Sequence, residues 1–296
     1  MKVDKIFRVG IFLCRIKRSF FAEYFNAWAS KIDPFLDTPG ESGRIITISS
    51  KKGWQPQIVK ILRRTHLGFF EGRITEDAER IVYFQLVRKV SKKIYFTFAV
   101  APDFREIFLL EDNTTSCRDI PFEYLGQIVP HAGIHYGQLT FHGVLLEHQG
   151  RGIILSAPSG TGKTTHARMW RDDRNALIIN GDRAACAKTE GVWTGYGLPW
   201  SGTSGEQVNR SVPVFALVVL ERGDRNEAVR VTDPLEAFFA VLPQVQYPSW
   251  DIDLSGKAMD LLEDFLRSVP VIRLRCLPEP AAVDVLAEAL EALSGK

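Results

Sequence analysis

A short apolar run, a loop of small residues and the start of a helix follow one another in the middle of this chain. The run Gly152–Ser156 is typical of a buried strand, and Ala157–Thr165 continues it as Ala-Pro-Ser-Gly-Thr-Gly-Lys-Thr-Thr. Small residues there let successive backbone N–H groups turn inward around a phosphate chain. A helix expected over about 163–170 adds partial positive charge where the phosphates would sit. The sequence therefore predicts a strand, a phosphate loop and a helix, in that order.

Single positions of this loop carry distinct chemistry. The pattern has Ala157 where its first glycine usually stands. Lys163 would reach the β- and γ-phosphates of a nucleoside triphosphate, ATP or GTP, and the hydroxyl of Thr164 would ligate Mg²⁺. The residues expected to hold the nucleotide are Ala157, Pro158, Ser159, Gly160, Thr161, Gly162, Lys163, Thr164 and Thr165. The alternative is a glycine-rich turn with an accidental Lys-Thr, which the order of the elements disfavours.

Length and composition set the class of protein. The 296 residues, 45% hydrophobic and 24% charged, suffice for one large or two ordinary globular domains. Cys14, Cys117, Cys186 and Cys276 lie far apart and form no CxxC pair, which favours free thiols in a reducing cytosol. No cleavable signal segment and no run of roughly 18 apolar residues is present. We therefore expect a cytoplasmic protein with no membrane contact.

Charge is unevenly distributed along the chain. Residues 1–100 contain 19 basic and 9 acidic residues, a net charge of +10, whereas the whole chain has a net charge of +2. Such an excess either attracts an acidic partner or forms an ordinary solvated surface. No zinc-finger, helix-turn-helix or RNA-binding signature accompanies it, so we expect no nucleic-acid partner.

The apolar patterns divide the chain into a small α+β domain over 1–125 and an α/β domain over 126–296. Within the first we expect an amphipathic helix over 5–30 and strands over 44–49, 83–87 and 94–100. Within the second we expect a short helix over 122–131 ending near Pro130, strands over 137–147, 176–179, 214–220 and 271–274, and helices over 257–269 and 281–293. Asp233 would cap a further helix with Leu235, Phe238, Phe239 and Leu242 on one face.

A phosphate loop alone does not specify a reaction, because a kinase also needs a carboxylate near Mg²⁺ or a base for the attacking hydroxyl. Asp182 follows a β-run and is the best candidate for both, the alternative being a turn-forming Asn-Gly-Asp. His142, in the strand before the loop, is either catalytic or a hydrogen-bonded core residue. Glu206 could assist the metal and Arg210 could steady the transferred phosphate, although surface roles explain both equally well.

These residues resemble a known family. Phe141-His142-Gly143-Val144, the strand before the loop, Ser159–Thr165 (SGTGKTT) and the strand ending at Asp182 follow one another as in HPr kinase/phosphorylase. The resemblance covers roughly residues 137–296 and implies the fold that this family shares with phosphoenolpyruvate carboxykinase. Gly197–Gly202 and Asn209-x-x-x-Pro213 are similar to a subgroup that includes lasso-peptide tailoring kinases.

The resemblance also implies roles for residues. Lys163 would be catalytic and Asp182 would match the second of the family's paired aspartates, the base for a serine hydroxyl. His142 would match the histidine beside that aspartate. The first aspartate of the pair is Gly181 here, so one carboxylate must serve metal and proton, or Glu206 must supply the other. This departure argues against phosphorolysis.

The sequence thus predicts an ATP- and Mg²⁺-dependent kinase acting on a serine of a peptide or protein, with a ribosomally made precursor peptide as the favoured substrate. Relatives are often homo-oligomers, and the sequence leaves the oligomeric state open. Two alternatives stay open: a small-molecule kinase on the same scaffold, and a non-catalytic nucleotide-gated regulator, which Gly181 favours.

Overall fold

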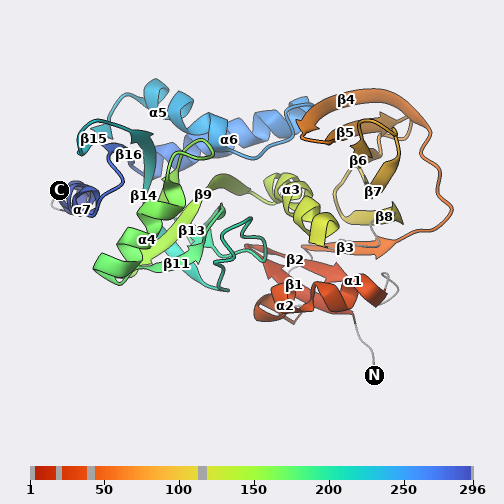
Figure 1. The fold of residues 1–296 in the computed structure, drawn as a ribbon, viewed down its shortest axis with the longest axis horizontal. Coiled ribbons are helices and arrows are strands. Elements are labelled where there is room, and N and C mark those ends of the chain that lie inside the picture. The colour runs from red at the N-terminus through yellow and green to blue at the C-terminus, as the bar shows by residue number, and fades with distance from the viewer. Residues whose placement is uncertain (1–3, 18–21, 39–43, 113–118, 295–296) are drawn as a thin grey trace. The chain divides into compact units, whose positions relative to one another are not determined.

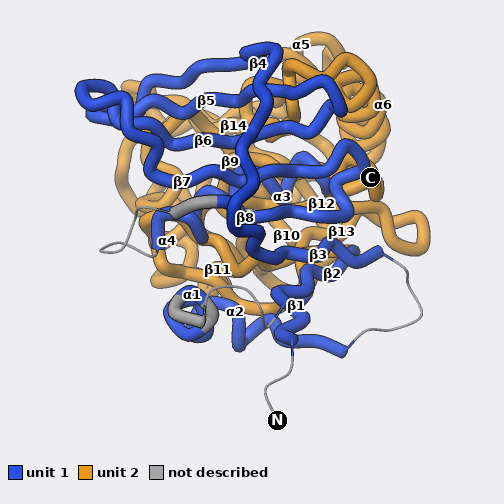
Figure 2. Tube along the Cα trace, turned by 90° about the vertical axis from the view of Figure 1, so that its right-hand side faces the viewer, with its two compact units in different colours: residues 1–8, 12–132 blue, residues 9–11, 133–296 orange. Residues whose placement is uncertain are grey.

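A computed structural model describes residues 4–17, 22–38, 44–112 and 119–294, and Cys117 lies outside them. The chain forms two compact units, residues 1–8 with 12–132 and residues 9–11 with 133–296 (Figure 2). The division at residue 132 falls inside a helix, α3 (Asp119–His135). The chain is a mixed α/β protein with two sheets (Figure 1).

The first unit is built on one sheet with the strand order β1-β2-β3-β8-β7-β6-β5-β4. Its strands are β1 (Lys5–Val9), β2 (Phe12–Ile16), β3 (Ile45–Ser50), β4 (Ile58–Leu67), β5 (Phe70–Asp77), β6 (Val82–Arg88), β7 (Ile94–Val100) and β8 (Glu106–Asp112). The pairs β2–β3 and β3–β8 are parallel, and the strands from β8 to β4 are antiparallel. Two short helices, α1 (Ala22–Ala27) and α2 (Ala29–Ile32), precede a 3₁₀ turn, η1 (Asp33–Phe35).

The helix expected over 5–30 is wrong in its first half. Residues 5–16 form the hairpin β1–β2, and Gly10 turns it with φ 63°. Phe7 and Val9 are buried while Arg8 between them is exposed, which is the period of a strand rather than of a helix. The aromatic residues Tyr24 and Trp28 do lie in the helical segment and are buried. Phe20 and Phe21 lie outside the described residues.

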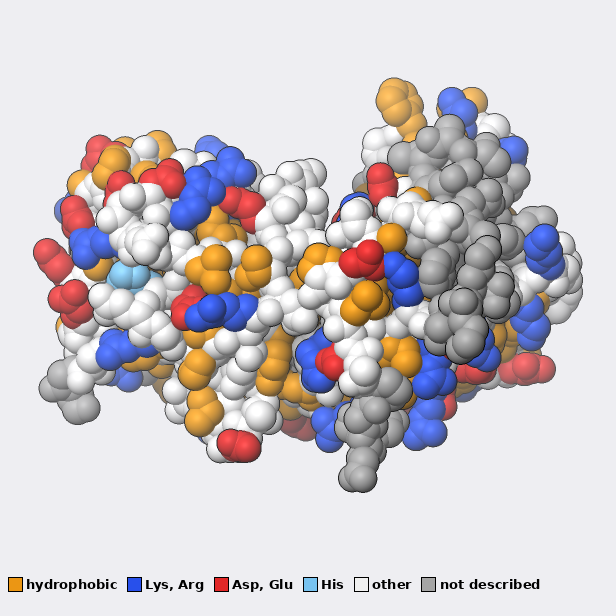
Figure 3. Space-filling model, turned by 90° about the horizontal axis from the view of Figure 1, so that it is seen from below, with side chains coloured by type: hydrophobic (Ala, Val, Ile, Leu, Met, Phe, Trp, Pro, Cys, Tyr) orange, Lys and Arg blue, Asp and Glu red, His pale blue; other side chains and the backbone are white. Residues whose placement is uncertain are grey.

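Some of the charges in the first unit form ion pairs on its surface. Lys5 pairs with Asp33, Arg8 with Asp37 and Arg73 with Glu71. On the face of the molecule drawn in Figure 3, basic and acidic side chains are interspersed. The edge strand β4 differs, because nearly all of its residues are exposed and they include several cations.

The second unit contains strands that pair in the order β10-β9-β12-β13-β14-β16-β15, with β11 paired to β9. The strands are β9 (Gln138–His148), β10 (Arg151–Ser156), β11 (Leu177–Asn180), β12 (Arg183–Thr189), β13 (Val192–Tyr196), β14 (Ser211–Arg222), β15 (Glu227–Val231) and β16 (Val271–Cys276). β14 also pairs with β10, so the pairings close a circuit through β9, β12 and β13. β10, β14 and β16 are parallel, and their carboxyl ends therefore share one edge.

Helices cover both faces of this sheet. They are α4 (Lys163–Arg174), α5 (Pro234–Val241), α6 (Ile252–Ser268) and α7 (Ala281–Ser294), with a 3₁₀ turn, η2 (Leu242–Gln244). Ile153 and Leu155 of β10 pack in one core with α4 and α7, whereas Ile154 between them packs in the other core with α5 and α6. This alternation fixes β10 between two buried faces, so the loop after it starts from a rigid strand.

Two helix expectations differ from the structure. α3 continues through Pro130 to His135, because burial of its apolar residues outweighs the roughly 3 kcal/mol that an interior proline costs. The helix capped by Asp233 forms, and the Asp233 carboxylate accepts from the Glu236 N–H at 2.8 Å. Its inward face carries Ala237 and Val241, while Leu235 and Phe239 are 69% and 67% exposed. Eight residues hold too few apolar positions to fix the rotation of the helix.

Among the described residues, no helix combines the length and the apolar character that a membrane crossing requires. The three described cysteines, Cys14, Cys186 and Cys276, are buried free thiols.

Candidate functional site

The turn between β10 and α4 has the backbone of a phosphate loop. Gly160 and Gly162 have φ 78° and 120°, values that favour glycine over residues with a Cβ. No atom lies within 4 Å of a Cβ built on Gly160, so conformation rather than space requires glycine there. α4 begins at Lys163, immediately after the loop, and runs for 12 residues. The free N–H groups at the start of such a helix form an anion site.

The Lys163 side chain folds back over this loop. Its Nζ donates to the carbonyl oxygens of Ala157 at 2.6 Å and Pro158 at 3.2 Å, and it lies 3.1 Å from Nε2 of His142. Burial lowers the pKa of Lys163, and the negative charge of Asp182 opposes that shift. The ammonium group is thus held where the loop residues and the catalytic candidates meet.

The other residues of the phosphate loop also lie at the turn between β10 and α4. The hydroxyl of Thr161 donates to the Pro158 carbonyl at 2.9 Å. Thr164 is half-buried in the first turn of α4, while Ser159 and Thr165 are exposed. All nine residues expected to hold a nucleotide are therefore contiguous around one turn.

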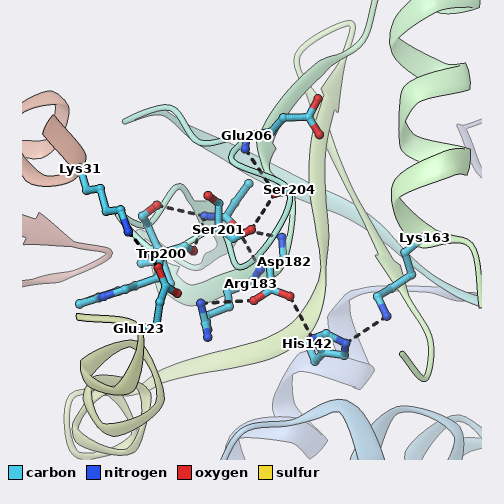
Figure 4. A network of polar contacts seen from close by, with 12 residues as sticks. Lys31, Glu123, His142, Lys163, Asp182, Arg183, Trp200, Ser201, Ser204 and Glu206 are labelled. Carbon is cyan, nitrogen blue, oxygen red and sulfur yellow. Dashed lines mark hydrogen bonds and ion pairs between the residues drawn. The ribbon is translucent and has the colours of Figure 1, made fainter. Parts of the chain in front are cut away.

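His142 connects this loop to Asp182. Its Nδ1 lies 3.5 Å from Oδ1 of Asp182, and its Nε2 faces Lys163 (Figure 4). Since the ammonium group of Lys163 can only donate, Nε2 accepts, and the neutral ring carries its hydrogen on Nδ1 facing the carboxylate. Burial, reinforced by the charge of Lys163, lowers the pKa of His142, which favours this neutral form. Lys163, His142 and Asp182 form one line of contacts.

The backbone explains why glycine follows His142. The N–H of Gly143 donates to the Asp182 carbonyl at 3.0 Å, and a Cβ at Gly143 would lie 2.8 Å from the Leu155 carbonyl oxygen. Ser156, at the end of β10, donates from its hydroxyl to the His142 carbonyl at 3.2 Å. The His-Gly pair thus joins the strand before the phosphate loop to the turn that contains Asp182.

Asn180 holds the turn that presents Asp182. Its Oδ1 accepts from the N–H groups of Asp182 at 3.0 Å and Arg183 at 2.8 Å. Its Nδ2 donates to the carbonyl oxygens of Leu198 and Trp200, both at 3.0 Å. Asn180 is fully buried. One side chain therefore fixes both the Asp182 turn and the glycine-rich loop that lies over it.

Gly181 stands where the resemblance places the first aspartate of the pair, and the structure leaves no room for a side chain there. A Cβ at Gly181 would lie 2.2 Å from the Ser204 hydroxyl oxygen. That hydroxyl donates to the Ser201 carbonyl at 2.7 Å and accepts from the Glu206 N–H at 3.2 Å. The Gly181 N–H in turn donates to the Glu206 carbonyl at 2.9 Å. The glycine-rich loop occupies the space of the missing carboxylate.

The same loop passes directly over Asp182. A Cβ at Gly202 would lie 2.7 Å from Cγ of Asp182, and Gly202 has φ 57°. Arg183 approaches from another side, with its Nη1 3.2 Å from Oδ2 of Asp182 (Figure 4). The carboxylate is therefore positioned by His142, Arg183 and the backbone at Gly202.

Two predicted site residues lie elsewhere. Glu206 turns away from Asp182 in Figure 4 and pairs with Arg171 at 3.0 Å and Arg168 at 3.6 Å, both on α4. Arg210 pairs with Glu147 near the end of β9. The structure brings Lys163, His142 and Asp182 together but brings neither Glu206 nor Arg210 to them.

Comparison with known families gives one match that covers more than half of the chain. The family described as "SynChlorMet cassette protein ScmC" matches residues 115–274, a range that contains the phosphate loop, His142 and Asp182. The chain belongs to the ScmC family. That description names a cassette and says nothing of lasso peptides.

Two further comparisons add little to this membership. No curated protein matches the chain. A solved structure, "Structure of the Hpr(Ser) kinase/phosphatase from Coxiella burnetii", aligns with 53% of this chain and 93% of its own, at 12% identity and a TM-score of 0.33. The chemistry open to this ScmC member therefore follows from its own residues, Lys163, His142 and Asp182.

The described residues of this ScmC member contain two candidate donors for a metal at the site. Among the described residues, no three His, Cys, Asp or Glu side chains gather as a metal cluster. The oxygen donors expected to hold a metal are the Thr164 hydroxyl, in the first turn of α4, and the Asp182 carboxylate, which His142 links to Lys163. This suits Mg²⁺, which proteins bind through one or two carboxylates together with substrate phosphates rather than in a full protein cage.

Sequence reasoning missed several residues of the site. Asn180 entered the sequence analysis only as part of the Asn-Gly-Asp turn, and Arg183 did not enter it. Arg222 donates to the carbonyl of Gly160 at 2.5 Å from the end of β14. The available signal was position, since an arginine that ends a fully apolar parallel strand lies at the same edge of the sheet as the phosphate loop.

Proposed function

We propose that this ScmC member is an ATP- and Mg²⁺-dependent phosphotransferase that moves the γ-phosphoryl group to a serine hydroxyl of a peptide or protein. The line of contacts Lys163–His142–Asp182 carries the proposal. It places a cation at the phosphate loop and a carboxylate beyond it, bridged by a histidine whose tautomer is fixed. A structural salt bridge would bring the two charges into direct contact; the bridging histidine keeps them apart.

The residues at the loop fit a nucleoside triphosphate. Lys163 donates to two neutral carbonyl groups of the loop, and phosphate oxygens would be stronger acceptors for the same ammonium group. Gly160 and Gly162 allow the loop to present its amides, and α4 adds the partial charge of its N-terminus. Mg²⁺ held by Thr164 and Asp182 would neutralise charge on the β- and γ-phosphates.

Asp182 would accept the proton of the attacking hydroxyl. As the hydroxyl oxygen bonds to phosphorus and the bond to the leaving oxygen breaks, the proton passes to the carboxylate. The Nδ1–H of His142 and the guanidinium of Arg183 hold that carboxylate in one orientation. Positioning and electrostatics would supply most of the rate, because the transition state of phosphoryl transfer is loose.

A peptide is the substrate that the first unit favours. β4 is an edge strand with exposed Lys60, Arg63 and Arg64, and residues 1–100 have a net charge of +10. An edge strand can pair with an extended peptide through its backbone, and these cations would favour an acidic one. The peptide class rests on this charge and on the family resemblance.

Labelled ATP tests the substrate class directly. Purified protein with [γ-³²P]ATP and Mg²⁺ is offered either a synthetic peptide encoded beside its gene or a panel of small alcohols and sugars. We expect label on the peptide, lost in Asp182→Asn. Label on metabolites alone would replace the peptide kinase with a small-molecule kinase.

Ser204 occupies the space beside Gly181, and this favours a second candidate function, a nucleotide-gated regulator. With Ser204 in place of a second carboxylate, the site has one acid where related kinases are expected to have two. A nucleotide-gated regulator would need only the loop and Lys163. Tight ATP binding without any turnover, in the presence of every offered acceptor, would support this alternative.

A further inference from the structure

Two neighbouring turns of the first unit lie at the same end of its sheet. One turn joins β4 to β5, and the other joins β6 to β7. Because β5 and β6 pair directly beside both turns, the turns are adjacent in space. The Phe69 carbonyl oxygen of the first turn accepts from the Lys89 N–H of the second at 3.1 Å. We call residues 66–70 and 88–94 together the basic tip.

Large apolar side chains project from the basic tip into solvent. Phe69 and Val90 are 82% and 90% exposed, and Leu67 and Ile94 are 40% and 38% exposed. Single exposed apolar residues are ordinary on a protein surface. Here they are gathered on two adjacent turns, which indicates an interaction surface.

The basic tip carries positive charge and no acidic residue of its own. Four cations lie within six residues of the β6–β7 turn: Arg88, Lys89, Lys92 and Lys93. The residues of the tip contain neither Asp nor Glu. Glu71, which follows the first turn, is buried and already pairs with Arg64 and Arg73. The tip therefore presents cations and apolar groups together, and its partner must be both anionic and apolar.

The opposite end of the same antiparallel strands has a different character. The β5–β6 and β7–β8 turns, residues 77–81 and 101–105, lie there. Their charged residues are three acids and two bases: Asp77, Glu79, Asp103, Arg80 and Arg105. Phe104 in the second of these turns is buried. The sheet is thus polarised along its strands, and the basic tip is the end that an anionic surface attracts.

We propose that the basic tip binds the surface of a lipid bilayer with anionic headgroups, with Phe69 and Val90 inserted at the boundary between headgroups and acyl chains. The cations lie at the level of the headgroups, where each Lys or Arg strengthens binding about 5-fold. A bilayer accepts projecting side chains without a fitted cavity, whereas a protein partner must provide pockets that match them.

This attachment is independent of the phosphate loop and of the phosphate acceptor. It runs against the expectation, drawn from the sequence, that the protein makes no membrane contact. Two inserted side chains alone bind a bilayer weakly, so the apolar residues and the cations must act together. Substitutions of either set should therefore weaken binding.

Sedimentation with lipid vesicles tests this surface. The full chain is mixed with vesicles of phosphatidylcholine alone, or of phosphatidylcholine with one third phosphatidylglycerol, at low and at high salt. We expect binding to the anionic vesicles only, and weaker binding at high salt because ions screen the headgroup charge. Binding to neither kind of vesicle, or equal binding to both, would overturn the proposal.

Charge reversals at the two ends of the sheet form a matched comparison. Lys92→Glu with Lys93→Glu alters the basic tip, and Arg80→Glu with Arg105→Glu makes the same change of net charge at the opposite end. Lys92 and Arg80 both have a positive φ, 56° and 63°, so backbone strain is shared. The first pair should weaken binding to anionic vesicles at least about 25-fold, and the second less than about threefold. Equal losses would mean that only net charge matters and would refute the tip as the contact surface.

Phe69→Ser with Val90→Ser tests insertion. Both side chains are exposed, so thermal unfolding should be unchanged, while binding to anionic vesicles should weaken about 10-fold. Unchanged vesicle binding by this variant would refute insertion. A synthetic peptide of alternating Glu and Leu represents the other occupant. If it binds the wild type through Phe69 and Val90 while vesicles do not bind, the partner is an acidic protein segment and the membrane proposal fails.

Discussion

The two halves of the site are built in different ways. The phosphate half is one continuous segment, β10, the loop and the start of α4, and its conformation follows from glycines within it. The carboxylate half depends on residues brought together from β9, the turn at residues 180–183 and the glycine-rich loop at 198–206. Local sequence is therefore enough to recognise the first half, whereas the second exists only in the folded chain.

This difference predicts separable functions. Changes in the phosphate half should alter nucleotide binding, and changes in the carboxylate half should alter transfer while leaving nucleotide binding without Mg²⁺ intact. Residues that support Asp182 indirectly should behave like Asp182 itself, with smaller effects.

The largest effect is expected for Lys163→Ala. Loss of the ammonium group removes the cation that faces the phosphates, so we expect both weaker ATP binding and a 100- to 1,000-fold slower transfer, by analogy with loss of one charge-stabilising donor. Calorimetry and labelled-phosphate transfer measure the two separately. Unchanged ATP binding would contradict the proposed difference between the two halves of the site, because Lys163 would then contribute nothing to binding the phosphates.

Asn180→Ala should cost about 2–3 kcal/mol in the free energy of unfolding, because it removes the partners of buried backbone groups at Asp182, Arg183, Leu198 and Trp200. Transfer should fall as the Asp182 turn loosens. Urea unfolding measures the stability. Asn209→Ala, at an exposed position three residues after the glycine-rich loop, is the matched control and should change the stability by less than about 0.5 kcal/mol. Equal losses in both variants would refute the role of Asn180.

Gly202→Ala tests the close approach over Asp182. Its added methyl group would press on Cγ of Asp182, so we expect transfer to fall about 10- to 100-fold with ATP binding retained. Gly205→Ala is a sharp control, because Gly205 also has a positive φ, 69°, but no atom lies within 4 Å of its Cβ position. Both variants share the backbone strain. Only Gly202→Ala should lose transfer; parallel losses would mean that strain alone matters.

The smallest effect is expected for Glu206→Gln. The Glu206 carboxylate pairs with partly exposed Arg168 and Arg171, and such pairs contribute at most about 1 kcal/mol. Transfer rate and its Mg²⁺ dependence should stay within about twofold of the wild type. A shift of the Mg²⁺ requirement to higher concentration would instead restore Glu206 as a metal ligand.

Sequence patterns predicted the elements that local residues determine and missed those that depend on distant residues. Periodicity located β10, α4 and β14 because both faces of the sheet are covered and the apolar runs are long. It failed at residues 5–16, where aromatic residues further along suggested a helix and the turn at Gly10 was overlooked. Periodicity also did not predict which residues of α5 are buried, because a helix of eight residues has too few apolar positions to specify its rotation.

Within the site, Asp182 and His142 could be selected as candidates, but their contact could not be deduced. That contact depends on Gly143 binding the Asp182 carbonyl and on Asn180 joining residues 198 and 200. Glu206 was attractive because it follows the glycine-rich loop, yet only folding shows that the arginines of α4 take its carboxylate. Long-range partners decide such roles, and the linear pattern does not contain them.

The most direct test of the account is Asp182→Asn, measured for ATP binding and for phosphate transfer on the same preparation. We expect ATP binding measured without Mg²⁺ to stay within about threefold of the wild type and transfer to be slower by at least about 100-fold, because the proton acceptor and metal ligand is removed while the phosphate half is untouched. Transfer at the wild-type rate would contradict it.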